Sequence, residues 1–156
     1  MKNINKGLSL LEIIISLGLI ATILATIIYI SINVYNNETR LNQNVDYIIN
    51  ILNIAKQKSI IQEKNQQWGV ILKNNATTAD YIQLFYNQPL ATSIERTFIL
   101  DQNINFVNIP TNSTKIIIFE KLKGKTTSTN IEISFGQTKK NIMINTSGLI
   151  FATSSL

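Results

Sequence analysis

The chain has 156 residues with no cysteine and no histidine, which excludes disulfides, thiolate metal sites and the histidine-based sites of most hydrolases. Charged residues make up 15% of the chain, and the net charge of +5 is too mild to indicate a particular anionic partner. The nine acidic residues are scattered, and Asp80, Asp101 and Glu120 are too dispersed for a calcium site, so we expect a protein without enzymatic activity, cofactor or metal.

The chain begins with a short basic segment, residues 1–7, in which Lys2 and Lys6 are the only charges. It is followed by an uncharged apolar run, Ile13–Ile32, whose twenty residues would form a helix about 30 Å long, the thickness of the hydrocarbon core of a bilayer. A secretory signal peptide is the alternative, but its apolar region spans only about 7–15 residues and ends in a small-x-small cleavage site. We therefore expect a retained transmembrane helix over 8–32, with its N-terminus in the cytoplasm and the remainder outside.

Beyond this run the apolar residues are restricted to one helical face. They recur at gaps of three, four and seven residues, which predicts a single stripe on an amphipathic helix: Val34, Leu41, Val45, Ile48, Leu52, Ala55 and Ser59. No proline occurs before Pro89, so no proline breaks a helix between the apolar run and its amphipathic continuation. We expect one helix from about Leu8 to about Glu63, with residues 33–64 as its amphipathic continuation.

The remaining residues, 65–156, have the pattern of a β-rich globular head. Polar turn clusters separate seven short runs rich in isoleucine, valine, phenylalanine and tyrosine: residues 68–72, 81–86, 96–100, 104–109, 115–120, 130–135 and 141–145. The short connections favour antiparallel pairing, because parallel strands need longer crossovers. We expect an α+β fold in which one antiparallel sheet packs its apolar face against the second half of the long helix.

The N-terminal motif is KGLSLLE (residues 6–12), followed by the uncharged run. This arrangement resembles the N-terminus of type IV pilins and of the pseudopilins of type II secretion. The resemblance implies cleavage after Gly7 by a membrane prepilin peptidase, N-methylation of the new first residue, Leu8, and a role for Glu12 in subunit assembly. It also implies a single-pass protein of the cytoplasmic (inner) membrane that joins other pilin or pseudopilin subunits in an extracytoplasmic filament.

The position of Glu12 has a physical reason within this resemblance. An ionised side chain inside an apolar helix costs about 2.5–3.5 kcal/mol at the membrane centre, so it needs compensation. After cleavage, the amine of Leu8 would lie one helical turn away, and Glu12 could pair with this amine or with that of a neighbouring subunit. The alternative is an uncleaved signal anchor with an accidental Gly7, but the combination of leader, glycine, glutamate and span favours processing.

The head carries a second resemblance. Trp68-Gly69-Val70, the tyrosine at the start of the run at 81–86, and IMINTSGLI (residues 142–150) resemble H-type minor pseudopilins and related minor pilins. The resemblance implies that the Trp68 strand opens the sheet and that a final strand pair closes it around a turn at Gly148. It favours a minor subunit.

A binding module for DNA uptake or for adhesion is the alternative function. It depends on five lysines that would cluster if the runs at 115–120 and 130–135 formed a hairpin: Lys121, Lys123, Lys125, Lys139 and Lys140. Such a patch could contact phosphates. No arginine or aromatic residue is interleaved with these lysines for base stacking, so a solvated hairpin tip is the favoured interpretation and nucleic acid is not the favoured partner.

Overall fold

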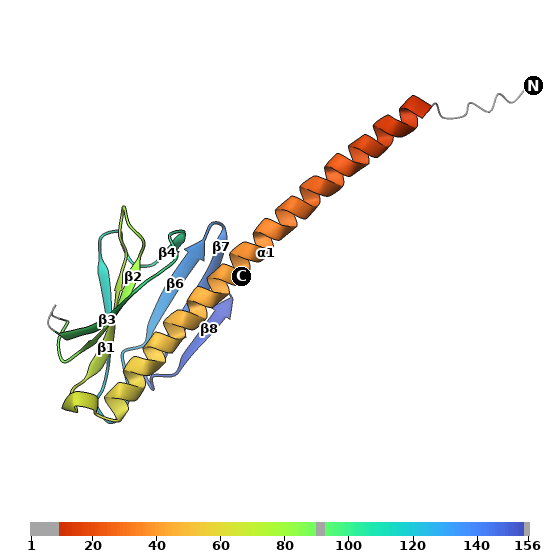
Figure 1. The fold of residues 1–156 in the computed structure, drawn as a ribbon. Coiled ribbons are helices and arrows are strands. Elements are labelled where there is room, and N and C mark those ends of the chain that lie inside the picture. Colours follow the sequence, from red (N-terminus) through yellow and green to blue (C-terminus); the bar gives the residue numbers. More distant parts are fainter. Residues whose placement is uncertain (1–9, 90–92, 155–156) are drawn as a thin grey trace, which may run out of the picture. The chain divides into compact units, whose positions relative to one another are not determined.

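The longest element of the computed structural model, which describes residues 10–89 and 93–154, is one helix, α1 (Leu10–Ile60) (Figure 1). The predicted long helix is therefore confirmed over the described residues, although it ends three residues before the predicted Glu63. The helix stops because Gln62 adopts a left-handed conformation with φ 54°, a common way for a helix to terminate. A short 3-10 turn, η1 (Glu63–Asn65), then leads into the first strand.

The chain divides into two compact units, one up to Asn36 and one from Asn37 onward, and α1 contributes to both. In the second unit the helix buries one face, formed by Leu41, Val45, Ile48, Ile51, Leu52, Ala55 and Ser59. The predicted stripe is confirmed from Leu41 to Ser59, with Ile51 as an additional member. Val34, which the pattern placed in the stripe, belongs to the first unit and is 57% exposed.

Among the described residues, eight strands follow the helix. They are β1 (Trp68–Lys73), β2 (Tyr81–Tyr86), β3 (Ile94–Ile99), β4 (Ile104–Phe106), β5 (Thr114–Phe119), β6 (Thr129–Phe135), β7 (Thr138–Ile144) and β8 (Ile150–Ser154). The first seven coincide with the predicted runs, with ends that differ by up to three residues. The last strand, β8, pairs with β7 around a turn in which Gly148 has φ 75°, as the resemblance of the head implied.

The predicted α+β fold with antiparallel strands is confirmed, but the strands form two sheets where a single sheet was expected. The orders are β3-β2-β1-β5 and β4-β6-β7-β8. The chain leaves the first sheet after β3, adds β4 to the second, returns for β5 and then completes the second sheet. Apolar residues of both sheets and of α1 join in one buried core. Both sheets bury an apolar face because both share this core with α1. Figure 1 shows β6 and β8 beside the C-terminal part of α1.

The end of α1 is fastened to the first sheet through Ser59. Its hydroxyl group is fully buried, donates to the carbonyl oxygen of Phe119 at 2.7 Å and accepts the N–H of Trp68 at 3.0 Å. Trp68 and Phe119 are direct partners in the β1–β5 pair. The indole N–H of Trp68 donates to the carbonyl oxygen of Glu63 at 3.0 Å. The helix end, η1 and two strands therefore meet at one tryptophan.

One edge of the second sheet is covered by a side chain. The first half of β6 extends beyond its β4 partner, which pairs only with Ile133–Phe135. There the carboxamide of Asn108 accepts the N–H of Glu132 at 3.0 Å and donates to the carbonyl oxygen of Asn130 at 2.8 Å. Lys115 donates to the same carbonyl at 2.5 Å. Asn108 thus replaces a strand residue at an edge that would otherwise be available to another chain.

Candidate functional site

The first unit consists, in its described part, of a helix whose residues are all exposed. Every residue from 10 to 36 is exposed, including large apolar side chains such as Leu10 (75%) and Tyr29 (70%). Within the described residues, α1 is the one helix long and apolar enough to cross a membrane. An all-round apolar helix of this kind requires lipid or other helices around it. This segment is a candidate single membrane span.

Polar residues within this span do not interrupt its apolar surface. The hydroxyl groups of Ser16, Thr22 and Thr26 donate to carbonyl oxygens of the preceding helical turn at 2.7–2.8 Å. Such bonds satisfy a hydroxyl group inside the helix itself. The one charged residue between Leu10 and Asn36 is Glu12.

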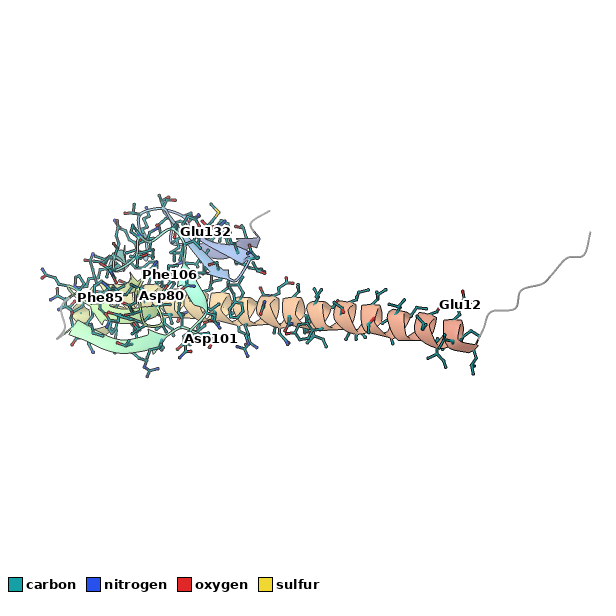
Figure 2. The ribbon with its side chains drawn as sticks, turned by 90° about the horizontal axis from the view of Figure 1, so that it is seen from above. Glu12, Asp80, Phe85, Asp101, Phe106 and Glu132 are labelled. Carbon is teal, nitrogen blue, oxygen red and sulfur yellow. The ribbon has the colours of Figure 1, made fainter. Side chains whose placement is uncertain are left out.

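Glu12 lies in the first turn of α1, and its side chain is exposed (Figure 2). The free N–H groups of a first turn carry the positive end of the helix dipole, which stabilises a carboxylate there. The structure therefore places Glu12 where its charge is compatible with a helix, at the boundary of the apolar surface. The predicted cleavage and methylation positions, Gly7 and Leu8, lie outside the described residues, as do Lys2 and Lys6.

The hairpin of the runs at 115–120 and 130–135, on which a cluster of the five lysines depended, does not form. Strand β5 pairs with β1 in the first sheet, whereas β6 pairs with β4 and β7 in the second. The connection between them bends around the end of α1, because Gly124 has φ 62° and lies so close to Ile60 that a Cβ would be 2.8 Å from its Cδ1 atom. The connection therefore crosses from one sheet to the other instead of turning back on itself.

The lysines themselves lie on different elements. Lys121, Lys123 and Lys125 lie in the connection after β5, and Lys139 and Lys140 lie on β7. Two of them interact within the chain: Lys121 donates to the backbone and side-chain oxygens of Asn65, and Lys139 forms an ion pair with Glu132 at 3.1 Å. The topology thus brings no basic hairpin together.

A different charged cluster, absent from the sequence predictions, lies at the C-terminal end of α1. Lys58 contacts Glu63 at 2.6 Å and Glu95 at 3.0 Å, and Lys64 contacts Glu95 at 3.2 Å. Lys58 also lies 4.3 Å from the ring centre of Trp68. Burial lowers the pKa of Lys58, but its hydrogen bonds to Glu63 and Glu95 outweigh this effect and leave the pKa above its ordinary value. The cluster joins the helix end to β3 and is structural in character.

The sequence predictions also missed the role of Asp80, which is 1% exposed. Its carboxylate accepts the N–H of Asn75 at 2.8 Å and the N–H of Phe106 at 2.8 Å. Figure 2 shows Asp80 and Phe106 together in the β-rich part of the molecule. A buried carboxylate satisfied by backbone N–H groups organises loops without a counter-ion. The sequence did contain one sign of this role: Asp80 is the only acidic residue of the turn NNATTAD (residues 74–80) and directly precedes a predicted strand.

Comparison of the chain with family models, with curated proteins and with solved structures found no match. Within residues 10–89 and 93–154, no group of three acidic residues lies close enough to hold a metal ion. The candidate site is therefore defined by its own residues: the exposed apolar part of α1 and the carboxylate of Glu12 in its first turn.

Proposed function

We propose that this protein is a prepilin-like structural subunit, a minor pilin or pseudopilin, that is processed after Gly7 and assembles through α1 into a type IV pilus or a type II secretion-like filament. The observation that supports the proposal most strongly is the position of Glu12, in the first turn of α1 and the one charge between Leu10 and Asn36, where every residue is exposed. A plain membrane anchor has no need of this charge.

Assembly follows from the cost of that carboxylate in an apolar environment. Removal of the leader creates an amine at Leu8, one turn before Glu12, with the opposite charge. In a bundle of such helices, an unpaired carboxylate is strongly destabilising, by about 3–5 kcal/mol for a buried pair that loses one partner. Neighbouring subunits are therefore selected in the axial register that places an amine beside Glu12. The apolar faces of the helices supply the remaining contact area.

The partners of the protein in this proposal are a prepilin peptidase, the cytoplasmic membrane and other pilin or pseudopilin subunits. Lys2 and Lys6 hold the leader on the cytoplasmic side, where the excess of positive charge is retained. The β-rich part from Asn37 onward then lies outside the cytoplasm. The protein acts by association, without a substrate or a cofactor.

The first test is the N-terminus of the membrane-bound protein in cells with a working prepilin peptidase. Mass spectrometry is expected to find a chain that begins with N-methylated Leu8, and Gly7→Asp is expected to retain the leader. An intact Met1 in the wild-type protein would refute the proposal and would favour an uncleaved anchor.

The second test separates assembly from membrane insertion. Glu12→Gln keeps the shape of the side chain and removes its charge, so the variant should be inserted and processed but incorporated into filaments at least about tenfold less well. Glu38→Gln is the matched control, because Glu38 is an exposed glutamate on the same helix. The amount of each variant in sheared filaments gives the comparison. Normal incorporation of Glu12→Gln would contradict the assembly mechanism.

A further inference from the structure

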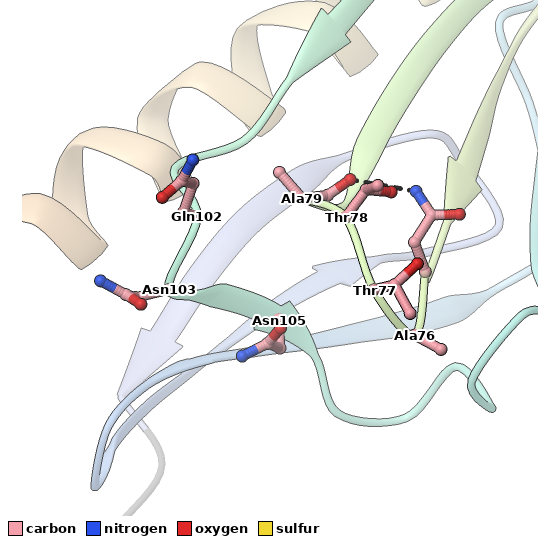
Figure 3. Close-up of a pocket in the computed structure, with 8 residues that line it drawn as sticks. Ala76, Thr77, Thr78, Ala79, Gln102, Asn103 and Asn105 are labelled. Carbon is pink, nitrogen blue, oxygen red and sulfur yellow. Dashed lines mark hydrogen bonds between the residues drawn. The ribbon is translucent and has the colours of Figure 1, made fainter.

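A pocket of about 530 Å³ lies between two loops of the second unit (Figure 3). One wall is the loop 75–79, which connects β1 to β2, and the other is formed by Gln102, Asn103 and Asn105, before and within β4. The volume falls within the range of about 300–1,000 Å³ found for small-molecule sites. The pocket is separate from the helix segment that carries the proposed function.

Both walls of the pocket are held by Asp80. Its carboxylate accepts the N–H of Asn75, at the start of the first wall, and the N–H of Phe106, at the end of the second. Its backbone carbonyl oxygen accepts the N–H of Leu100 at 2.9 Å, just before the second wall. The carboxamide of Asn75 donates to the carbonyl oxygen of Ala79 at 3.0 Å and closes the first loop on itself. The pocket is therefore preformed, which lowers the entropic cost of binding.

The polar side chains of the walls are available to a ligand. Within the described part of the chain, no hydrogen bond joins another residue to the side chains of Thr77, Thr78, Gln102, Asn103 or Asn105. Figure 3 shows the threonines on one loop and the three carboxamides on the other. Hydroxyl and carboxamide groups can both donate and accept hydrogen bonds. The pocket thus presents several unused donors and acceptors around one space.

The lining also defines the class of ligand. It contains no lysine or arginine for a phosphate or carboxylate group, no carboxylate for a divalent cation and no aromatic ring for a flat base. Asp80 and Asp101 directly follow and precede the two walls in the chain, and their negative charge disfavours an anion further. A neutral ligand with many hydroxyl groups fits this arrangement of uncharged donors and acceptors. We propose that the pocket binds a neutral saccharide through the side chains of Thr77, Thr78, Gln102 and Asn105.

The test uses the full chain in phosphocholine micelles, because detergents with maltoside headgroups would compete for the pocket. Chitotriose and maltotriose, added separately up to about 10 mM, distinguish an N-acetylated glycan from a plain hexose chain, and both carry the required hydroxyl groups. One of them is expected to shift the backbone amide signals of 76–79 and 102–105 in NMR spectra, with saturation.

The variant Gln102→Ala combined with Asn105→Ala should weaken this binding about tenfold, since it removes two side chains that would bond the ligand. The matched control combines Gln137→Ala with Asn50→Ala, two exposed carboxamide residues outside the pocket, and should bind like the wild type. An unchanged amide spectrum without ligand shows that the double variant is folded.

Failure of both saccharides to shift the pocket amides would overturn the proposal, as would binding that is equally strong in both double variants. A matching shift produced by inorganic phosphate or by Ca²⁺ would overturn the neutral class of ligand. The saccharide test measures neither processing nor filament incorporation, so its result does not depend on the proposed filament function.

Discussion

Gly69 lies directly opposite Phe85 in the β1–β2 pair, and the phenylalanine ring occupies the space that a side chain at position 69 would need. A Cβ atom at Gly69 would lie 2.7 Å from Cζ of Phe85 and 2.5 Å from the carbonyl oxygen of Ile117 on β5. Both neighbours are buried, and one of them is backbone. The glycine of the WGV motif is therefore required by packing in the first sheet.

Gly69→Ala should lower the free energy of unfolding by about 1–3 kcal/mol, the usual cost of overpacking a core. Urea unfolding followed by the fluorescence of Trp68, the one tryptophan in the chain and a fully buried residue, measures the change. Gly18→Ala is the control, because a Cβ at Gly18 would meet nothing within 4 Å. Equal stability of the two variants would contradict this account of the motif.

Asp80→Asn should also destabilise the fold, because the carboxamide has one oxygen where the carboxylate accepts two backbone N–H groups. One of the N–H groups of Asn75 and Phe106 would lose its acceptor, at a cost of about 1–3 kcal/mol. Amide hydrogen exchange at Phe106 and urea unfolding report the loss. Asp101→Asn should have little effect, since Asp101 is exposed and its bond with Asn44 is long, at 3.4 Å.

The cluster around Glu95 predicts a dependence of stability on pH. Burial raises the pKa of the Glu95 carboxyl group, but hydrogen bonds from Lys58 and Lys64 outweigh burial, so the pKa lies below its ordinary value of 4.5. A carboxyl group with a depressed pKa in the folded state stabilises the fold above its unfolded pKa and loses this contribution as the pH falls through the folded value. The stability should therefore decrease as the pH falls below 4.5.

Glu95→Gln should remove part of this acid dependence and lower the stability at neutral pH by about 0.5–1 kcal/mol, as for other partly exposed ion pairs. Unfolding in urea between neutral and acidic pH, for the wild type and the variant, gives the difference. Glu120→Gln serves as the control, because Glu120 is exposed and forms no ion pair with the described residues. Parallel pH profiles for the wild type and Glu95→Gln would exclude the cluster as the cause.

Asn108→Ala should expose the edge of β6. The N–H of Glu132 and the carbonyl of Asn130 would lose the carboxamide that replaces a neighbouring strand, which costs about 1 kcal/mol. Faster amide exchange at Glu132 and a greater tendency to aggregate are the expected results, since an uncovered edge can pair with another chain. The control is Asn50→Ala, at an exposed position on α1. Unchanged exchange at Glu132 would show that water satisfies the edge equally well.

Local patterns were sufficient to predict most elements of the fold. The helix and the first seven strands were predictable because apolar periodicity and turn residues report on local structure, and β2 (Tyr81–Tyr86) agrees with its predicted range at both ends. The order of strands was not predictable in the same way. Whether β5 pairs with β6 or with β1 depends on contacts far apart in the chain, such as that between Gly124 and Ile60, which periodicity does not describe.

The same difference between local features and distant contacts applies to the candidate site and the pocket. The uncharged run and Glu12 were recognisable from the sequence because a membrane span and a lone charge within a few residues are local features. The pocket was not recognisable, because its two walls are more than twenty residues apart in the chain and are joined by long-range hydrogen bonds, such as those that the carboxylate of Asp80 accepts from Asn75 and Phe106. Its lining residues have the composition of ordinary turns.

The attachment of Ser59 to Trp68 and Phe119 has a mechanical consequence. The buried stripe of α1 runs lengthwise from Leu41 to Ser59, so a pull on the helix along its axis would load all of these contacts in shear at once. The last of them is also hydrogen-bonded to two neighbouring strands of the first sheet. The force would therefore pass into β1 and β5 and would not peel the helix away one turn at a time. The end of the first sheet at which Trp68 and Phe119 pair would carry the tension.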